Sequence, residues 1–466
     1  MPETSSAEEK DVAYDLARNV AMITYEDLPP EVVETTKMSI LDTLGVIVAA
    51  SGTVPGVAEM VELAKETGGR EESTIVGFGG RVPAMMAAFA NAAMGHAIDY
   101  DDLHHVAMVH PSSPAVTAGF AIAERVGGVS GRDFIAAVAL GNDLACRVGM
   151  AVPLKGTWHP TTVFAVFGAA ATSGKLLGLD QEQMVDTLGI AFCHAAGTME
   201  LREGVGSNLG GMRDAFPAKG GVLSALMAQK GIAGVKNTFE GRSGLFPVYF
   251  NGEYDRDVII SELGKKFEGA YVGFKPWPSC GTTHIYIDAT LQIVSEHDIL
   301  PEDIEEITAT VGDFAEKLFV PLEGRRRPAT TLDAKYSIPF TVATAAVRRQ
   351  VLIKDFLPEG LKDPAALEMA QKVVPRYDPA FTTVKGRPPG EIELRTKQGK
   401  VYKKRLEVPY GHHTNPLSRR DIVKKFKDCA QYALKPLSAK DIDRVIELTG
   451  RMEALDDAGE VIRLLG

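Results

Sequence analysis

The densest group of side chains able to do chemistry lies in the segment GHAIDYDDLHHVAMVHP, residues 95–111. It holds three aspartates and four of the ten histidines: Asp99, Asp101, Asp102, His96, His104, His105 and His110. A carboxylate beside an imidazole can fix its tautomer and move its pKa, so the segment could donate and accept protons. It could instead bind a divalent metal, although its spacing matches no His-x-x-x-His or EF-loop pattern. On a purely structural interpretation, Asp101 or Asp102 caps a helix and one or two histidines are exposed.

A second candidate is His159, which stands directly before Pro160 where a helix is predicted to begin. The first turn of a helix offers free backbone N–H groups to an anion, and the imidazole of His159 could add another donor. Taken alone, this histidine is interpreted as a structural residue whose hydrogen bonds are satisfied.

Two further segments are rich in glycine or proline. GVGSNLGGMRDAF lacks the preceding strand and the following acidic partner of a dinucleotide-binding loop, so we interpret Gly204–Gly211 as a flexible loop that delivers Arg213. FKPWPSCGTTH supplies Lys275, Cys280 and His284. Taken alone, Lys275 is a basic residue beside a turn and Cys280 a small buried filler.

The elements that must position these residues are helices throughout the first 270 residues. Apolar residues recur there at helical spacing, and Pro, Ser or Gly marks many of the ends. Several segments, such as AMMAAFANAAMG, are crowded with Ala and Gly, which lets helices approach closely and predicts a buried bundle. The predicted helices span residues 29–52, 83–96, 114–126, 132–152, 160–177 and 181–196.

After about residue 270 the pattern changes. Residues 304–311 alternate as in a strand, and GEIELRTKQGKVYKKRLEV predicts a hairpin that turns near Gln398–Gly399. Helices are predicted over residues 333–349 and 365–374, and Arg325–Arg327 are interpreted as solvated charges in a loop. Helices return in the segment 418–466.

This order predicts a mainly α protein, with a large discontinuous all-helical domain and a smaller α+β domain inserted into it. The helical domain is expected to comprise residues 1–270 and 410–466, and the α+β domain residues 271–409.

The composition excludes several classes of protein. The 466 residues include 50 Lys and Arg against 61 Asp and Glu, a net charge of -11 without a sustained basic run, which argues against binding nucleic acid or an anionic membrane. The four cysteines contain no Cys-x-x-Cys motif, so no disulfide framework, zinc site or iron–sulfur cluster is predicted. The sequence shows neither a signal-peptide core nor a run of about 18 apolar residues, and we expect a cytoplasmic protein.

Five segments in a fixed order carry a family resemblance: NAAMGHAIDYDDLHHVAMVHPSS, GTWHPTTVFAVFGAAATSGKLLGL, FKPWPSCGTTHIYIDA, DAKYSIPFTVA and GHHTNPLSRRDIVKKF. Together they resemble the MmgE/PrpD superfamily, which includes 2-methylcitrate dehydratase, cis-aconitate decarboxylase and iminodisuccinate epimerase. The ordered set spans the chain almost end to end. The resemblance implies a helical domain built from both ends of the chain, a smaller lid domain, a homodimer, and an active site without a cofactor or metal.

The resemblance also assigns individual residues. Asp99, the first aspartate of DYDD, and His110, the histidine of HPSS, match catalytic-pocket positions of the family. His159 matches the histidine of the second motif, and Lys275 the lysine at the head of the lid.

Several pocket positions depart from individual branches of the family. Leu103, Arg213 and Cys280 stand where the decarboxylases carry threonine, lysine and histidine. The segment PSCGTTH also lacks the Pro-Ala-Glu-Phe-His run of the 2-methylcitrate dehydratases. It resembles the K-P-x-P-x-C-x-x-T-H pattern of the epimerase branch, although Gly281 replaces the arginine that usually follows the cysteine.

The leading hypothesis is a metal-independent lyase or isomerase that acts on a small di- or tricarboxylic acid. Dehydration, decarboxylation and epimerisation all place negative charge next to a carboxylate, so the site needs cations and a proton carrier. Arg213 and Lys275 are predicted to bind carboxylates. His110, oriented by Asp99, is predicted to be the first general acid/base, and His159 the second.

The remaining pocket residues leave alternatives open. Cys280 is either the opposing base of an epimerase or a buried, inert thiol, and His284 and Tyr336 are expected to line the pocket at the lid. A ligand-binding homologue without catalysis is a second hypothesis, motivated by Leu103 and Gly281. A metal hydrolase at the Asp/His cluster is disfavoured by the spacing and by the resemblance.

Overall fold

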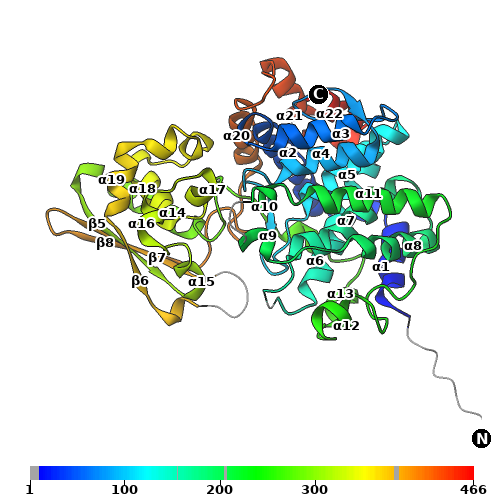
Figure 1. The fold of residues 1–466 in the computed structure, drawn as a ribbon, viewed down its shortest axis with the longest axis horizontal. Coiled ribbons are helices and arrows are strands. Elements are labelled where there is room, and N and C mark those ends of the chain that lie inside the picture. Colours follow the sequence, from blue (N-terminus) through cyan, green and yellow to red (C-terminus); the bar gives the residue numbers. More distant parts are fainter. Residues whose placement is uncertain (1–9, 155, 204–206, 383–387) are drawn as a thin grey trace, which may run out of the picture. The chain divides into compact units, whose positions relative to one another are not determined.

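The chain forms two compact units in the computed structural model, which describes residues 10–154, 156–203, 207–382 and 388–466. The first unit is helical and consists of Met1–Val272 together with Ile422–Gly466. The second unit, Gly273–Asp421, combines helices with a sheet. The chain is therefore mainly α with a smaller α+β unit, as the sequence predicts (Figure 1).

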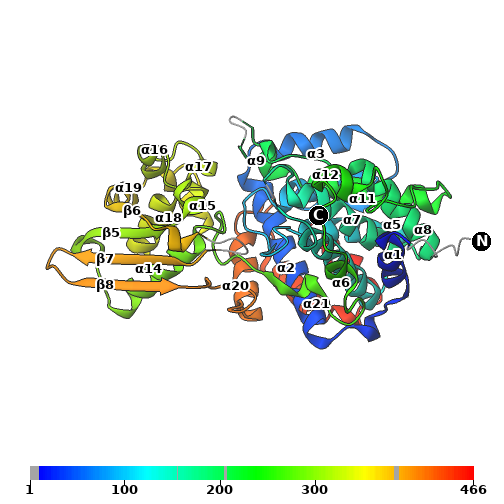
Figure 2. The same ribbon diagram turned by 90° about the horizontal axis from the view of Figure 1, so that it is seen from below.

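The helical unit is a bundle around the buried helix α7, Pro160–Leu176, which packs on α5, α6 and α11 (Figure 2). The long helices are α1 Val12–Met22, α2 Pro30–Thr53, α3 Val57–Glu66, α4 Ala84–Gly95, α5 Ser112–Val126, α6 Gly131–Met150, α8 Gln181–Ala191, α11 Ala215–Gln229, α20 Arg419–Ala430 and α21 Ala439–Gly450. Short helices are α9 Glu200–Glu203, α10 Leu209–Met212, α12 Leu245–Phe250, α13 Arg256–Ile260 and α22 Gly459–Arg463, and short strands are β1 Ser73–Thr74, β2 Arg81–Val82, β3 Leu103–His104 and β4 Val272–Gly273.

Small residues bring the central helices into backbone contact. A Cβ atom added at Gly141 of α6 would lie 2.6 Å from the carbonyl oxygen of Gly168 in α7, and one added at Gly221 of α11 would lie 2.5 Å from Ala169 Cβ. Larger side chains at these positions would force the helices apart. The Ala- and Gly-rich segments therefore form the close-packed core that their composition predicts.

The α+β unit is built on a four-stranded sheet with the order β6-β5-β7-β8. The strands are β5 Ile304–Val311, β6 Val373–Tyr377, β7 Gly390–Thr396 and β8 Val401–Leu406; β5 pairs parallel with β6 and antiparallel with β7. The helices are α14 His284–Glu296, α15 Asp313–Glu316, α16 Leu322–Arg326, α17 Thr331–Lys335, α18 Ile338–Arg348 and α19 Pro364–Gln371. Figure 1 shows α14 and α18 packed together beside the sheet.

Strand β5 and the hairpin of β7 and β8 confirm the predicted strand and turn, but three predicted helices have different ends. The helix predicted over 365–374 stops at Gln371, because Val373 begins β6, which pairs with β5. The helix predicted over 333–349 is interrupted at Tyr336–Ser337, where the Ser337 side chain caps α18 by accepting the Phe340 N–H. The helix predicted over 181–196 ends at Ala191.

Two predicted loops also differ. Arg325 and Arg326 lie in the short helix α16, and Arg326 donates to the carbonyl oxygen of Val373 at 3.0 Å, so these arginines are not simply solvated charges. In the predicted loop Gly204–Gly211, residues 204–206 lie outside the described residues. Leu209–Met212 form the short helix α10, directly before Arg213.

Among the described residues, no single helix is long and apolar enough to cross a membrane. Helices α2 and α3 reach that length and composition only as a pair, with a bend of 99° at the break between them.

The C-terminal segment closes directly on the start of α6. The N–H of Gly131 donates to the Leu455 carbonyl oxygen at 2.8 Å, and a Cβ atom at Gly131 would lie 1.6 Å from the carbonyl oxygen of Met452. The side chain of Ser130 caps the same helix by accepting the Asp133 N–H. The start of α6 has no room for a methyl group.

We therefore expect Gly131→Ala to lower the free energy of unfolding of the helical unit by about 1–3 kcal/mol, because the added methyl group would displace backbone. Thermal unfolding followed by far-UV circular dichroism measures the change. Gly324→Ala is the control, since the nearest atom to its new Cβ would be Pro321 Cγ at 3.4 Å. Equal melting temperatures for the two variants would contradict the tight closure at Gly131.

Candidate active site

The candidate site lies in the segment that joins α4 to α5 in the helical unit. Its backbone turns sharply twice, with left-handed φ values of 53° at Asp99 and at Met108. The Asp99 N–H donates to the His96 carbonyl oxygen at 2.8 Å, and the His104 N–H donates to the Val109 carbonyl oxygen at the same distance. These turns fold the segment back on itself, so that residues far apart within it meet.

At the centre of the site, the Asp101 carboxylate lies between two imidazoles. Its Oδ1 atom is 2.7 Å from His96 Nδ1, and its Oδ2 atom is 3.0 Å from His110 Nδ1. The two imidazole rings meet edge to face, with centroids 4.6 Å apart. Asp99 Oδ1 lies 3.9 Å from the other ring nitrogen of His96. All four side chains are buried.

The hydrogen bonds fix the tautomer of His110. Its Nδ1 atom also lies 2.6 Å from the carbonyl oxygen of Asp102, and a carbonyl oxygen can only accept a hydrogen bond. Nδ1 therefore carries the proton, and in the neutral ring Nε2 carries the lone pair. His110 is thus oriented as a base through Nε2.

Burial and local charge separate the protonation states of the group. Burial and the charge of Arg213 lower the pKa of His96 to about 3, so His96 is neutral at physiological pH. Burial alone would raise the pKa of Asp101, but the neighbouring imidazoles of His110 and His96 hold it well below its usual range. A charged carboxylate therefore faces a neutral imidazole on one side and His110 on the other.

Asp102 occupies a different environment at the start of α5. Its Oδ2 atom accepts a hydrogen bond from Ser112 Oγ at 2.5 Å and another from Ser39 Oγ at 3.3 Å, and Asn142 donates to the same Ser112 oxygen at 2.9 Å. Burial, together with the charges of Asp42 and Asp101, raises the pKa of Asp102 to about 7. Asp102 can therefore hold a proton near neutral pH.

The start of α7 lies against this group. The backbone N–H of His110 donates to Thr161 Oγ1 at 3.1 Å, and His159 is two residues before that threonine. His159 is buried directly before α7, and its own N–H donates to the Gly197 carbonyl oxygen at 3.1 Å. The second sequence motif is thus joined to the first by a direct hydrogen bond.

Arg213 is a cation of this unit whose charge acts on His96. It directly follows α10, is buried, and donates to the Gly210 carbonyl oxygen at 2.5 Å. A Cβ atom at Gly211 would lie 3.5 Å from the carbonyl oxygen of Ala97, the residue after His96. Helix α10 therefore brings Arg213 to the beginning of the site segment.

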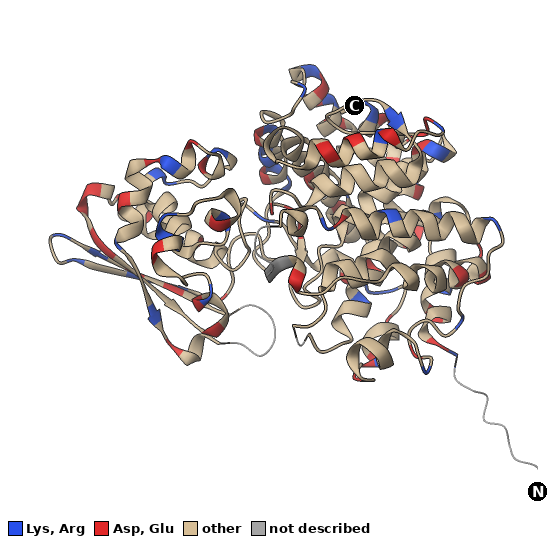
Figure 3. Cartoon of the chain, in the orientation of Figure 1, with Lys and Arg blue, Asp and Glu red and all other residues tan. Residues whose placement is uncertain are grey.

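Two of the helices beside the site, α4 and α7, carry almost no charge. Helix α4 has no charged residue, and α7 has only Lys175 in its last turn (Figure 3).

Four predicted residues belong to the α+β unit. Cys280 is buried in its hydrophobic core, Tyr336 packs partly buried against that core, and Lys275 is buried near the beginning of the unit. The Cys280 N–H donates to the Lys335 carbonyl oxygen at 3.0 Å, which places Cys280 next to Tyr336. His284 starts α14, with Nε2 3.2 Å from the Ser279 carbonyl oxygen and its ring 5.3 Å from that of Trp277.

By proximity alone, His96, Asp101 and His110 could also hold a metal ion, since their ligand atoms lie within 4.8 Å of one another. Two ligand atoms bound to one tetrahedral zinc ion at about 2.0–2.1 Å would be roughly 3.3 Å apart. The separation of 2.7 Å between His96 and Asp101 is shorter and matches a hydrogen bond. The described geometry therefore fits a shared proton better than a shared metal.

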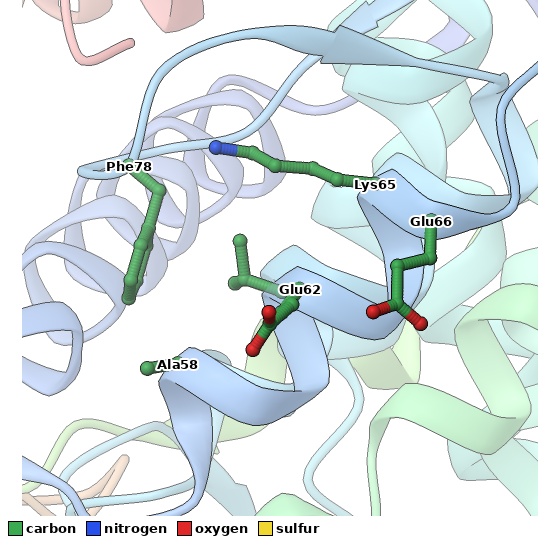
Figure 4. A pocket seen from close by; sticks show the side chains of 6 residues that line it. Ala58, Glu62, Lys65, Glu66 and Phe78 are labelled. Carbon is green, nitrogen blue, oxygen red and sulfur yellow. The ribbon is translucent and has the colours of Figure 1, made fainter.

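A surface hollow of about 480 Å³ lies elsewhere in the helical unit (Figure 4). It is lined by α3 and the loop between β1 and β2: Ala58, Val61, Glu62, Lys65, Glu66 and Phe78. None of the predicted site residues lines it, and its charged side chains form no carboxylate–imidazole pair. We therefore place the candidate site at the buried histidines.

Two family models match the chain in sequence. The MmgE/PrpD N-terminal domain matches residues 14–257, and the MmgE/PrpD C-terminal domain matches residues 277–449. The chain belongs to the MmgE/PrpD family. This confirms the resemblance that the five sequence segments indicate.

Several full-length relatives are similar to this MmgE/PrpD protein. The cis-aconitate decarboxylase-like protein oryM of Aspergillus oryzae is 27% identical over 100% of this chain and 98% of its own length. The cis-aconitate decarboxylase of Aspergillus terreus is 26% identical, over 94% of this chain and 92% of its own. The human cis-aconitate decarboxylase is 27% identical, over 94% and 91%.

In this MmgE/PrpD chain, the structure joins the predicted residues of the helical unit into one neighbourhood. Asp99 lies beside His96, His159 is linked to His110 through Thr161, and Arg213 acts on His96. Lys275, Cys280, His284 and Tyr336 lie in the other unit.

Two details differ from the sequence-based interpretation. The carboxylate found at His110 Nδ1 is that of Asp101, whereas Asp99 was predicted to orient this ring. None of the four histidines of the segment is exposed, and His104 has a structural role, since its Nδ1 accepts the Ala107 N–H at 3.1 Å.

Sequence reasoning left His96, Asp101 and Asp102 out of the predicted site, although all three belong to the cluster it identified. It also left out Lys335, a buried lysine next to Tyr336. The sequence feature that could have indicated these residues is their position inside a family motif, GHAIDYDD or DAKYSIPF.

We expect Asp102→Asn to change how stability depends on pH. The folded protein keeps the Asp102 proton up to about pH 7, whereas the unfolded chain releases it near pH 4, so stability due to this group is lost as the pH rises between these values. One unit of pKa corresponds to about 1.4 kcal/mol, so the variant should gain up to roughly 4 kcal/mol relative to wild type between pH 4 and pH 8. Urea unfolding at a series of pH values measures this difference, and parallel profiles for the two proteins would contradict the raised pKa.

Proposed function

We propose that this protein is a lyase that acts on a small di- or tricarboxylic acid by acid–base catalysis next to a carboxylate, without a metal. The observation that carries the proposal is the buried group of His96, Asp101 and His110, in which one carboxylate lies between two imidazoles and Arg213 is close by. Membership of the MmgE/PrpD family and relatives named cis-aconitate decarboxylase support a lyase acting on a carboxylic acid.

In this proposal His110 Nε2 is the atom that exchanges a proton with the substrate. The Nδ1 proton is held by the Asp102 carbonyl oxygen, and the negative charge of Asp101 stabilises the imidazolium that forms when Nε2 takes up a proton. Neutral His96 keeps Asp101 in position without neutralising it. His159 is proposed as the second acid/base, because Thr161, two residues after it at the start of α7, accepts a hydrogen bond from the His110 N–H.

The proposed role of the two cations, Arg213 and Lys275, is to bind the carboxylates of the substrate. In a decarboxylation, the electrons of the broken C–C bond remain on the substrate as CO₂ leaves, and a proton from the acid completes the product. In a dehydration, a base removes a C–H proton and an acid protonates the leaving hydroxyl group as water. Both reactions build negative charge beside a carboxylate, and Arg213 and Lys275 are proposed to offset it, Arg213 through bidentate contact. Asp99, His284 and Tyr336 are proposed to line the pocket.

A second candidate is an epimerase of a similar acid, favoured by Cys280 in its K-P-x-P-x-C-x-x-T-H segment. An epimerase needs two groups on opposite faces of one carbon, and a thiol could be the second of them. The burial of Cys280 among apolar side chains supports the inert alternative equally.

A substrate panel in deuterium oxide tests the proposal. The protein is incubated with cis-aconitate, 2-methylcitrate and iminodisuccinate, and proton NMR follows each acid. A lyase forms a new alkene or releases CO₂, whereas an epimerase only exchanges the α-hydrogen for deuterium and inverts the centre. If these acids raise the melting temperature of the protein but none of them is converted or exchanges hydrogen, the protein is a binding homologue. That result would refute the proposal.

His110→Gln should lower kcat by about 10²- to 10⁴-fold, the usual contribution of a general acid/base, while the protein stays folded. Steady-state rates on the best acid of the panel measure this loss. His297→Gln is the matched control, because His297 is an exposed histidine outside the candidate site, with its ring centroid 4.4 Å from that of Tyr402. Wild-type rates for His110→Gln would remove this residue from the mechanism.

Activity should survive exhaustive treatment with a chelator, because the proposed chemistry uses only protons and fixed cations. Rates before and after dialysis against EDTA, with metal content checked by mass spectrometry, measure this. Loss of activity that added iron, zinc or magnesium restores would show instead that the His/Asp group works through a metal.

A further inference from the structure

A buried lysine of the C-terminal segment contacts the backbone of the candidate site segment. Lys425 of α20 donates from Nζ to the carbonyl oxygen of Tyr100 at 2.5 Å, across 325 positions of sequence. The same nitrogen lies 3.8 Å from the centroid of the Tyr100 ring and 2.6 Å from Asp42 Oδ1. The side chains of Lys425 and Asp42 are 4% and 1% exposed, so the pair is almost fully removed from water.

Helix α2 supplies the other side of this contact. Ser39 and Asp42 lie one turn apart on α2; Ser39 donates to Asp102, and Asp42 pairs with Lys425. One turn further on, a Cβ atom at Gly45 would lie 3.2 Å from Phe426 Cδ2 of α20. One face of α2 therefore contacts both the site segment and the helix that carries Lys425.

A buried ion pair is a poor source of stability, because removing both charges from water costs about as much as their attraction returns. Such a pair can instead select one local arrangement. Here the selected group is the Tyr100 carbonyl, which lies between Asp99 and Asp101 in sequence. Since Asp99 has a left-handed backbone, this short stretch needs outside contacts to hold its conformation.

We propose that Lys425, held by Asp42, is a positioning residue of the active site: it fixes the Tyr100 carbonyl and thereby keeps Asp101 between His96 and His110. The inference rests on the proposed function for its catalytic consequence, but the geometry it describes exists without substrate. Lys425 acts on Asp101 through the Tyr100 carbonyl oxygen, to which it donates.

The test uses the full chain with three variants. Lys425→Met removes the donor to Tyr100. Asp42→Asn/Lys425→Met also removes the donor but leaves no unpaired buried charge, so it keeps the test valid if the single variant fails to fold. Lys427→Met is the matched control, because Lys427 is a lysine of the same helix whose ion pair with Asp443 is exposed.

Two measurements follow on each folded variant. The first is the kinetic split: a misplaced Asp101 should lower kcat by about 10- to 100-fold while KM changes little, because a displacement of roughly 1 Å suffices for such a loss. The second is NMR of selectively labelled histidine without substrate, with the signals of His96 and His110 assigned through His96→Gln and His110→Gln. These signals should move in both Lys425 variants and stay in place in Lys427→Met.

A folded double variant with wild-type kcat and wild-type histidine signals would overturn the inference. If both Lys425 variants unfold while Lys427→Met folds, the pair serves stability, and the positioning role is also refuted. If the wild type acts on no acid of the panel, the proposed function fails, but the histidine signals still decide whether Lys425 positions Asp101.

Discussion

The whole candidate site depends on one buried carboxylate. Asp101 keeps its negative charge inside the helical unit because an imidazole lies at hydrogen-bond distance from each of its oxygens. Without these partners, burial would drive a proton onto the carboxylate. The two histidines in turn keep their orientation because the carboxylate is there. The charge of Asp101 and the orientation of the two imidazoles therefore support each other.

Two neighbouring aspartates show how the surroundings assign different states to the same side chain. Asp101 faces imidazoles and stays ionised, whereas Asp102 faces hydroxyl groups and two other carboxylates and has a pKa of about 7. Ser39 and Ser112 can donate to Asp102 whether or not it is protonated at its other oxygen. Adjacent positions in the sequence thus provide a permanent charge and a titrating group.

Much of this protein could be predicted from its sequence, for physical reasons that also set the limits. Strand β5 alternates because one of its faces is buried, and the Ala- and Gly-rich helices are recognisable because close packing requires small residues. Strand β6 was missed since it follows a helix after one residue, contains Pro375, and is an edge strand held by β5. The site cluster was recognisable by its composition, but the choice of Asp101 over Asp99 depends on two left-handed turns that these residue types do not specify. Lys425 gives no local signal, because its partners are hundreds of positions away.

The division of the chain also has a consequence for biosynthesis. The helical unit needs both Met1–Val272 and Ile422–Gly466, so a ribosome must finish nearly the whole chain before that unit can close. The α+β unit, Gly273–Asp421, is continuous and is complete earlier. Until α20 has been synthesised, the loop with Asp101 lacks its contact with Lys425. The face of α2 that packs against α20 in the folded protein is exposed during this time. A chain released early would carry every histidine of the site and still lack the contacts that shape it.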